Sequence, residues 1–169
     1  ARVMLLRRLE GQAWPDVSDT ALLAGLEHWA APWLAGVSRL RQLERFPLGD
    51  ALRQQLDYAA AQRLDVLAPA AVTVPSGRQA AIDYCDENGP VLAVKLQEMF
   101  GLTQTPQIAG GRQPLTLHLL SPARRPVAVT QDLASFWQQG YPQVRKDLRG
   151  RYPRHPWPED PDRKSTRLN

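Results

Sequence analysis

Prolines in the C-terminal segment from Gly140 to Pro161 constrain the fold more than any other feature of the chain. Pro142 stands where a helix would begin and Gly150 where it would end, which is the favoured placement of both residues. Beyond Gly150, prolines stop further helix and favour extended backbone, at positions 153, 156, 158 and 161. We therefore predict a short basic helix followed by a stiff, Pro-rich tail.

Two aromatic residues lie within this tail. Tyr152 and Trp157 offer large apolar surfaces that a solvated segment would leave exposed. We expect them to act as tail anchors that pack on the body of the protein or on a partner. The tail belongs to a predicted C-terminal extension over residues 131–161, which also contains a helix over 131–139 that ends at Gly140.

Residues 1–68 carry the periodicity of helices. Leu22, Leu26, Trp29 and Trp33 follow one another at intervals of four, three and four residues, which places them on one helical face. Pro32 is expected to kink or split that helix. A second helix, capped by Asp50, is predicted to run to position 64. A leucine stripe of this kind is typical of core packing, so this segment is predicted to be a helical packing region.

The pattern changes at Pro69. Residues 69–130 contain short alternating runs separated by turn sequences at 75–77 and 86–90, and the run at 115–120 is the clearest strand. One short helix, closed by Gly101, interrupts them. This composition predicts a small antiparallel β module, either a barrel of OB type or an open sheet, which strand count alone does not distinguish. The predicted fold class is α+β.

Charge is unevenly distributed along the 169 residues. Residues 1–109 have a net charge of −2, whereas residues 110–157 have a net charge of +6. A basic surface suits nucleic-acid phosphates, although a solvated arginine face would look the same. The candidate nucleic-acid-binding residues are Arg78, Lys95, Arg112, Arg124 and Arg125 near the β turns, and Arg145, Lys146 and Arg149 on the basic helix.

Aromatic residues on which bases stack would complete such a surface. Tyr84, Phe100 and Tyr141 are the candidates, although each is also a candidate for the core.

The sequence lacks the motifs of several enzyme classes. It contains no phosphate-binding P-loop and no DEAH box, and the acidic stretch at 85–89 lies in a predicted turn. His28, His118 and His155 occur in unrelated settings, so we predict neither catalytic nor metal-ligating residues. The single Cys85 excludes an internal disulfide and is expected to be a buried apolar side chain. No signal peptide or membrane span is visible, and a cytoplasmic location is expected.

Several long strings resemble one family of helicases. The stretches PSGRQAAIDY (75–84), GPVLAVKLQEMFGL (89–102), GRQPLTLHLLSPARRPVAVTQDLASFW (111–137) and RGRYPRHPWPEDP (149–161) resemble the C-terminal region of HrpB-type bacterial DEAH-box, ATP-dependent helicases. The resemblance runs from about Trp14 to Pro161. It implies an upstream motor that binds ATP and Mg²⁺ and favours an OB-like module, but it does not fix the substrate. From the basic residues we expect a nucleic-acid partner, with RNA favoured over DNA.

We accordingly expect an accessory region of a helicase, a fragment that lacks the motor and its cofactors. Two alternatives remain open at this point: a module that docks a protein partner, and a structural clamp that holds the motor domains together. Residues 162–169 break the preceding pattern and are expected to be a non-native or disordered tail.

Overall fold

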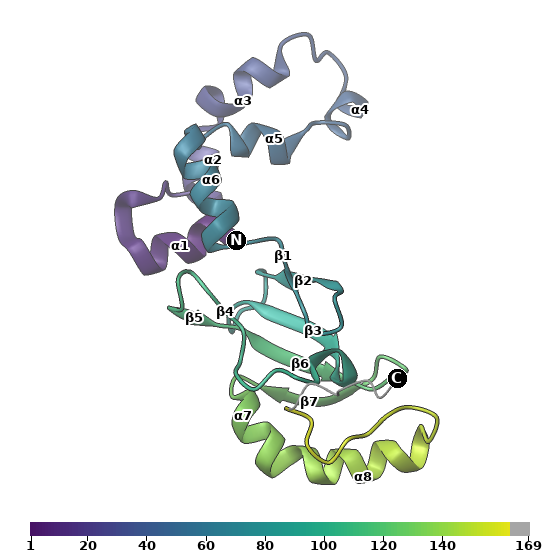
Figure 1. Ribbon diagram of the computed structural model, residues 1–169. Coiled ribbons are helices and arrows are strands. Elements are labelled where there is room, and N and C mark those ends of the chain that lie inside the picture. The colour runs from purple at the N-terminus through teal and green to yellow at the C-terminus, as the bar shows by residue number, and fades with distance from the viewer. Residues whose placement is uncertain (163–169) are drawn as a thin grey trace. The chain divides into compact units, whose positions relative to one another are not determined.

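The computed structural model describes residues 1–162 (Figure 1). The chain divides between Ala68 and Pro69 into two compact units. This division coincides with the change of sequence pattern at Pro69, where helical periodicity gives way to short strands.

All secondary-structure elements of the N-terminal unit are helices. Its helices are α1 (Arg2–Glu10), the 3-10 turn η1 (Gly11–Ala13), α2 (Asp19–Ala24), α3 (Leu26–Leu34), α4 (Leu40–Leu43), α5 (Leu48–Arg53) and α6 (Tyr58–Leu67). The hydroxyl of Ser18 accepts a hydrogen bond from the Ala21 N–H at 3.3 Å and so caps α2. The predicted helix from Asp50 to position 64 is wrong, because Asp57 accepts from the Ala60 N–H at 2.7 Å and starts α6 as a separate helix.

Trp14 is the centre of the core between α1 and α6. Its side chain is fully buried, and its indole N–H donates to the Glu10 carboxylate at 2.6 Å. The Arg63 guanidinium lies 5.3 Å from the ring centroid and pairs with the same carboxylate at 2.8 Å. Leu6 of α1 and Leu64 of α6 are also buried. Trp14 thus links α1 and α6 through a buried aromatic side chain that also has polar and cationic partners.

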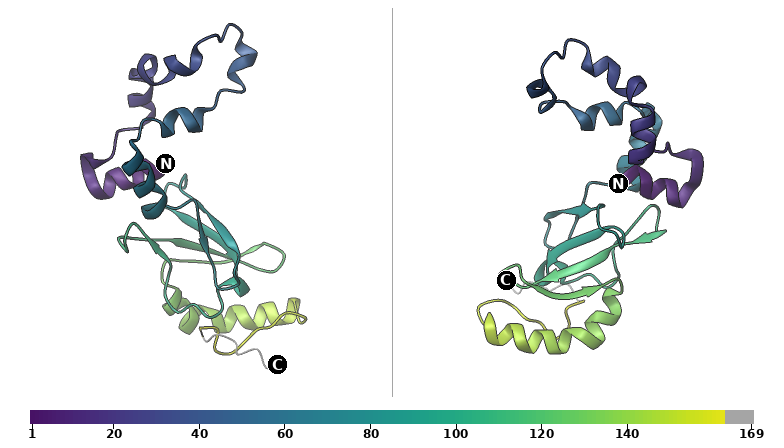
Figure 2. Two further views of the ribbon diagram at one scale, coloured as in Figure 1. Left: turned by 45° about the horizontal axis from the view of Figure 1, so that its top comes forward. Right: turned by 180° about the vertical axis from the view of Figure 1, so that it is seen from behind.

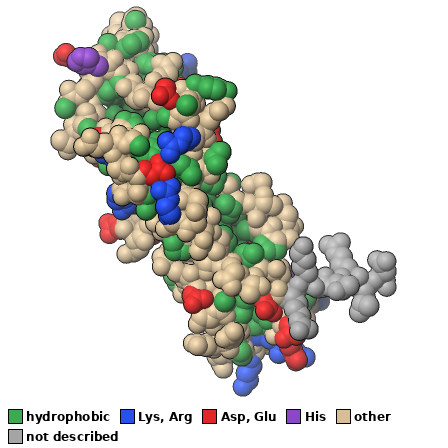
Figure 3. All heavy atoms as spheres, turned by 60° about the vertical axis from the view of Figure 1, so that its left-hand side comes forward, with side chains coloured by type: hydrophobic (Ala, Val, Ile, Leu, Met, Phe, Trp, Pro, Cys, Tyr) green, Lys and Arg blue, Asp and Glu red, His purple; other side chains and the backbone are tan. Residues whose placement is uncertain are grey.

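The leucine-rich faces of α2 to α5 are less buried than the sequence predicts. Leu26, a member of the predicted core stripe, is 42% exposed, and several neighbouring leucines are also exposed: Leu23, Leu40, Leu43 and Leu48. Figure 3 shows hydrophobic side chains reaching the surface of this unit. Pro32 is accommodated inside α3, and the break between α2 and α3 falls at Gly25. The prediction of a fully packed stripe is therefore wrong for Leu26.

A five-stranded sheet forms the second unit, with strand order β1-β2-β3-β6-β7. The strands are β1 (Ala71–Thr73), β2 (Gln79–Asp83), β3 (Val91–Lys95), β6 (Thr116–Leu120) and β7 (Pro126–Thr130), and a separate ribbon pairs β4 (Gln107–Ile108) with β5 (Gln113–Pro114). The α+β class is confirmed. The prediction of an antiparallel module is wrong for one pair of strands, because β3 and β6 are parallel.

The connection between β3 and β6 explains this parallel pair. It contains the 3-10 turn η2 (Leu96–Met99) and the β4–β5 ribbon, and it is long enough to return the chain to the same end of the sheet. Among the described residues, the sheet has β1 and β7 as its two outer strands, so closure into an OB-like barrel is not confirmed.

Inward-facing side chains from the central strands make the core of this unit. Leu92, Leu117 and Leu119 have no exposed surface, and Leu96 and Met99 of η2 are equally buried. In both views of Figure 2 a long helix lies along the β7 side of the sheet. Its first turn contributes the buried Leu133 to this core.

That long helix is continuous where the sequence predicts two helices. α7 (Leu133–Ser135) passes through a π turn, η3 (Phe136–Gly140), directly into α8 (Tyr141–Arg151). Gly140 does not end a helix, and Gly150 lies inside α8. Because Pro142 has no N–H, the usual bond to the carbonyl four residues before cannot form there, and the Tyr141 N–H instead donates to the Phe136 carbonyl in the wider π spacing.

Gly140 has a steric role in this helix. A Cβ at this position would come within 2.7 and 2.9 Å of two ring carbons of Phe136, whereas a Cβ at Gly150 would meet nothing within 4 Å. Phe136 therefore packs directly over the glycine, and the close approach explains a residue that sequence reasoning reads as a helix stop.

These two glycines give a matched test. We expect Gly140→Ala to lower the free energy of unfolding by roughly 1–3 kcal/mol, because Phe136 must move out of its packed position. Gly150→Ala should instead raise it by roughly 0.5–1 kcal/mol, since alanine is the better helix former at an open position. Urea unfolding of both variants decides the matter, and equal effects would contradict the steric role of Gly140.

Candidate nucleic-acid interface

Three of the predicted basic residues meet at one end of the sheet. Arg78, Lys95 and Arg124 line a hollow of about 330 Å³, together with Glu98 and three apolar positions: Ala93, Val94 and Leu120. The three cations come from different segments of the chain. Their meeting is a property of the fold that sequence order does not reveal.

Strand register explains how these residues come together. Lys95 ends β3 and lies opposite Leu120, the last residue of the parallel strand β6. The turn that follows β6 carries Arg124, so it emerges beside Lys95. β2 runs antiparallel to β3, which sets the beginning of β2 at the same end, directly after Arg78.

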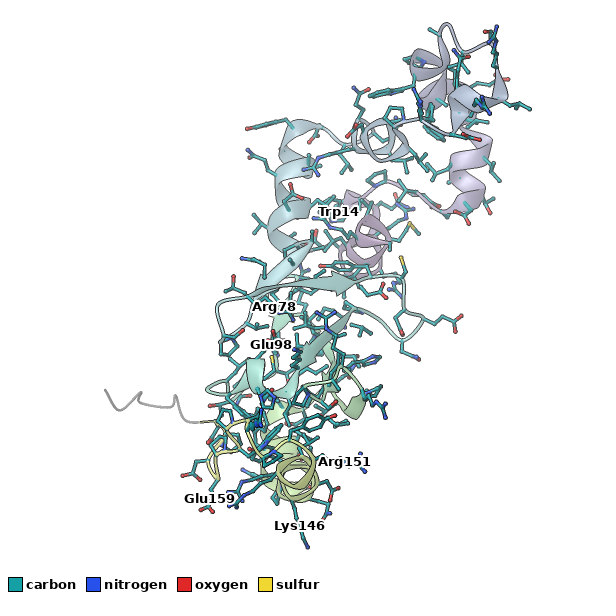
Figure 4. The ribbon with its side chains drawn as sticks, turned by 90° about the vertical axis from the view of Figure 1, so that its right-hand side faces the viewer. Trp14, Arg78, Glu98, Lys146, Arg151 and Glu159 are labelled. Atoms are coloured by element: carbon teal, nitrogen blue, oxygen red, sulfur yellow. The ribbon has the colours of Figure 1, made fainter. Side chains whose placement is uncertain are left out.

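Arg78 is already engaged with a carboxylate. Its Nε and Nη2 atoms lie 2.5 and 2.8 Å from the two oxygens of Glu98, a two-point pair that Figure 4 shows with both side chains adjacent. The Arg78 guanidinium holds the pKa of Glu98 below its usual range, against the opposing effect of burial, and the Lys95 N–H adds a further hydrogen bond to the carboxylate. Glu98 in turn raises the pKa of Arg78. The hollow therefore contains three cations and one anion.

The turn that carries Arg124 has a constrained backbone. Arg124 has a φ of 60°, in the left-handed region that side chains other than glycine seldom adopt. Ser121 holds this conformation: its carbonyl accepts from the Arg124 N–H at 2.8 Å, and its hydroxyl accepts from the Arg125 N–H at 3.2 Å. Strain of this kind collects at functional sites, and here it fixes where Arg124 leaves the sheet.

The other predicted basic residues lie elsewhere. The Arg112 Nε donates to the Ala109 carbonyl at 2.8 Å in the β4–β5 ribbon, and Arg125 is exposed beside the hollow without lining it. Lys146 and Arg149 are exposed on α8, and Figure 4 shows Lys146 and Arg151 pointing outward from this helix. Lys146 and Arg149 are therefore on α8 and do not line the hollow.

Arg145 has a structural part instead. Its Nε donates to the Trp157 carbonyl at 2.8 Å, and its Nη2 lies 3.3 Å from Glu159. Of the three basic residues predicted on the helix, Arg145 is therefore the one whose guanidinium binds the tail.

Sequence reasoning missed two features. Glu98 was not among the predicted site residues, although its position three residues after Lys95 has the spacing of a capping box. A further hollow, of about 660 Å³ in the N-terminal unit, has three arginines in its wall, Arg39, Arg41 and Arg45. The net negative charge of residues 1–109 concealed this local cluster.

One of the three candidate stacking residues is buried, and the other two are partly exposed. Tyr141 is 1% exposed, and burial raises its pKa to about 12. The Tyr84 hydroxyl donates to the Pro69 carbonyl at 2.6 Å. Phe100 is partly exposed and contacts Trp137, Tyr141 and Trp157 with ring centroids 5.9 to 6.5 Å apart. Of the two partly exposed candidates, Phe100 is the one whose ring packs against three aromatic neighbours.

The tail folds back along α8, as the yellow segment in Figures 1 and 2 shows. Trp157 is only 8% exposed and stands edge-on to Phe100, with its indole N–H donating to the Tyr152 carbonyl at 2.9 Å. Tyr152 is partly buried and contacts His155 edge-on. The Tyr141 hydroxyl donates to the Pro158 carbonyl at 2.8 Å.

The tail is also fastened further along. The Gly101 N–H donates to the Pro161 carbonyl at 2.7 Å. The described part of the tail is therefore joined to the β module through the aromatic cluster and through backbone.

Other chemistry is not indicated in the described part of the chain. No group of three or more His, Cys, Asp and Glu side chains could hold a metal ion within residues 1–162. Cys85 is exposed, so its predicted burial is wrong, because it follows the end of β2 and lies outside the sheet. None of the helices described here has the length and apolar character of a membrane span.

Removal of the tail anchor should destabilise the second unit. We expect Trp157→Ala to lower the free energy of unfolding by roughly 3 kcal/mol, because the substitution empties a buried site beside Phe100. Arg154→Ala, at an exposed position of the same tail, should change it by less than about 0.5 kcal/mol. Thermal unfolding followed by tryptophan fluorescence and circular dichroism measures both, and an unchanged transition in Trp157→Ala would contradict the anchor.

Comparison with known proteins identifies the family. The family described as ATP-dependent helicase C-terminal matches residues 29–161. The ATP-dependent RNA helicase HrpB of Escherichia coli is 51% identical over 148 residues, which cover 88% of this chain and 18% of that protein.

Two solved structures agree with this result. The crystal structure of the E. coli DExH-box NTPase HrpB is 47% identical, with a TM-score of 0.92 over 97% of this chain and 20% of that one. The crystal structure of the E. coli DEAH/RHA helicase HrpB is 46% identical, with a TM-score of 0.75 over 92% of this chain and 20% of that one. The chain thus spans about a fifth of the length of these relatives, and the resemblance seen in the sequence is confirmed: the chain belongs to the ATP-dependent helicase C-terminal family, as found in HrpB.

Proposed function

We propose that the chain is an accessory region of an ATP-dependent RNA helicase and that it holds single-stranded nucleic acid beside the motor. The observation that carries the proposal is the meeting of Arg78, Lys95 and Arg124 around one hollow, from three different segments. Cations that line one hollow can contact the phosphates of a nucleic-acid backbone.

RNA is the favoured partner. The E. coli relative is named an ATP-dependent RNA helicase, and single strands are what a helicase generates. ATP and Mg²⁺ would bind the motor of the longer protein, and an RNA substrate favours a cytoplasmic setting. Three of the remaining predicted residues, Arg112, Lys146 and Arg149, would extend the basic surface around the strand.

A structural function for the N-terminal unit is the second candidate. Leu40 is 84% exposed and Leu23 is 71% exposed, and apolar surface of this extent favours contact with another part of a larger protein. The motor of the longer helicase would be that partner. Recruitment of a separate protein by Trp157 is disfavoured, because this side chain is buried within its own unit.

Charge reversal at neighbouring arginines tests the hollow. The chain should bind a fluorescently labelled oligoribonucleotide, and the logarithm of the affinity should fall with the logarithm of salt concentration at a slope of roughly −3 for about four phosphate contacts. Arg124→Glu should weaken binding and make this slope shallower by about 0.7 or more. Arg125→Glu is the matched control, since it changes the same charge on a residue that does not line the hollow.

The outcomes of this titration, read by fluorescence anisotropy, are distinct. Equal losses in the two variants would show that general charge, and not the hollow, attracts the strand. The double variant Lys146→Glu, Arg149→Glu tests the α8 surface in the same way. No binding by the unmodified chain, even in low salt, would contradict the proposed function.

Glu98 should oppose binding. Because its pKa lies below the usual range, it stays ionised at neutral pH and neutralises Arg78. We expect Glu98→Gln to raise the affinity for the same oligoribonucleotide several-fold and to steepen the salt dependence, because Arg78 becomes available to a phosphate. An affinity that stays the same or falls, in a variant whose circular dichroism is unchanged, would remove Arg78 from the proposed interface.

A further inference from the structure

A second hollow adjoins the basic one and has a different character. It is a groove of about 900 Å³, and none of the twelve residues in its wall carries an ionisable side chain. Ring surfaces line it at four positions, the aromatic Phe100 and the prolines Pro75, Pro106 and Pro156. The side chains of Gln97 and Gln104 add amide donors and acceptors to the same wall.

The two hollows share the same two chain segments. Ser76 and Gln97 line the groove, whereas Arg78 and Glu98 line the basic hollow. The Ser76 N–H donates to the Glu98 carbonyl at 3.3 Å, which ties these segments together. The segments around Ser76 and Glu98 therefore contribute neighbouring residues to both hollows.

The pair of hollows has the chemical division of a nucleotide. A phosphate is charged and suits Arg78, Lys95 and Arg124, whereas a base is uncharged, planar and carries hydrogen-bonding groups at its edge. Phe100 offers a ring that is held by three aromatic neighbours, so little side-chain entropy is lost when a base stacks on it. The amides of Gln97 and Gln104 can pair with base edges.

We propose that this groove holds a base of single-stranded RNA whose phosphates lie on Arg78, Lys95 and Arg124. The inference rests on the function proposed above and adds to it the place and the chemistry of base contact. It also gives the tail a part in binding. Pro156 is one wall of the groove, and the fastening of Trp157 and Pro161 holds that wall in place.

The first test separates base contact from phosphate contact. The 169-residue chain is titrated with a labelled oligouridylate and with an abasic oligoribonucleotide of the same length, which keeps the phosphates and sugars. Stacking and edge contacts should make the oligouridylate bind about tenfold or more tightly. Equal affinities would overturn the base groove and leave the phosphate interface intact, whereas no binding of either would overturn both proposals.

Two variants locate the effect in the groove. Gln104→Glu places a negative charge in its wall at an exposed position, and Gln139→Glu makes the same change at an exposed position that does not line it. We expect several-fold weaker oligouridylate binding in Gln104→Glu and little change in Gln139→Glu. Equal effects of the two variants would contradict the proposal.

Phe100→Leu tests the stacking surface itself. Its affinity for oligouridylate should fall to that for the abasic strand, while its affinity for the abasic strand should stay unchanged. A general loss of folding would lower both affinities together, so the two probes distinguish a damaged fold from a lost stacking surface. An unchanged preference for oligouridylate in Phe100→Leu would exclude Phe100 as the stacking residue and overturn the groove as proposed.

Discussion

The parallel pairing of β3 with β6 is the constraint on which the second unit depends. It matches Lys95 with Leu120, so the ends of two strands and the turn that carries Arg124 lie together. A parallel pair needs a long return connection. Here that connection contains η2 and the residues that follow it. Glu98 lines the basic hollow, and Phe100 and Gly101 line the groove. The Gly101 N–H also binds the tail through the Pro161 carbonyl. One register thus places the basic residues, their acidic neighbour and the aromatic cluster.

The helix and the tail stabilise that arrangement from one side. Phe136 packs on Gly140, and the π turn brings the helix past Pro142 without a break. Tyr141 and Arg145, on the same helix, donate to the Pro158 and Trp157 carbonyls of the tail. The predicted extended tail contains a turn, in which the His155 N–H donates to the Tyr152 carbonyl at 3.2 Å, and the side chains of α8 hold the residues that follow this turn. The helix therefore supports the tail, and the tail supports the Phe100 loop.

The sequence predicted what depends on local pattern. The α+β class and the strand predicted at 115–120, observed at Thr116–Leu120, follow from periodicity. It failed where distant contacts decide. Glycine at 140 and proline at 142 would normally indicate the end of one helix and the start of the next. The helix continues here, and the packing of Phe136 against Gly140 explains the glycine. The grouping of Arg78, Lys95 and Arg124 depends on the register of the β-sheet. The pairing of Arg78 with Glu98 depends on a contact between the turn before β2 and the 3-10 helix η2. No sequence pattern predicts either contact.

The aromatic cluster has a consequence for how the protein is made. Phe100 and Trp137 are synthesised before Trp157. During synthesis, Phe100 therefore lacks its contact with the Trp157 ring until the tail has emerged from the ribosome. A nascent chain that stops short of the tail keeps those rings uncovered, and uncovered apolar surface is what chaperones and proteases act on. Burial of Trp157 therefore completes the aromatic cluster only once the chain has been synthesised beyond position 157.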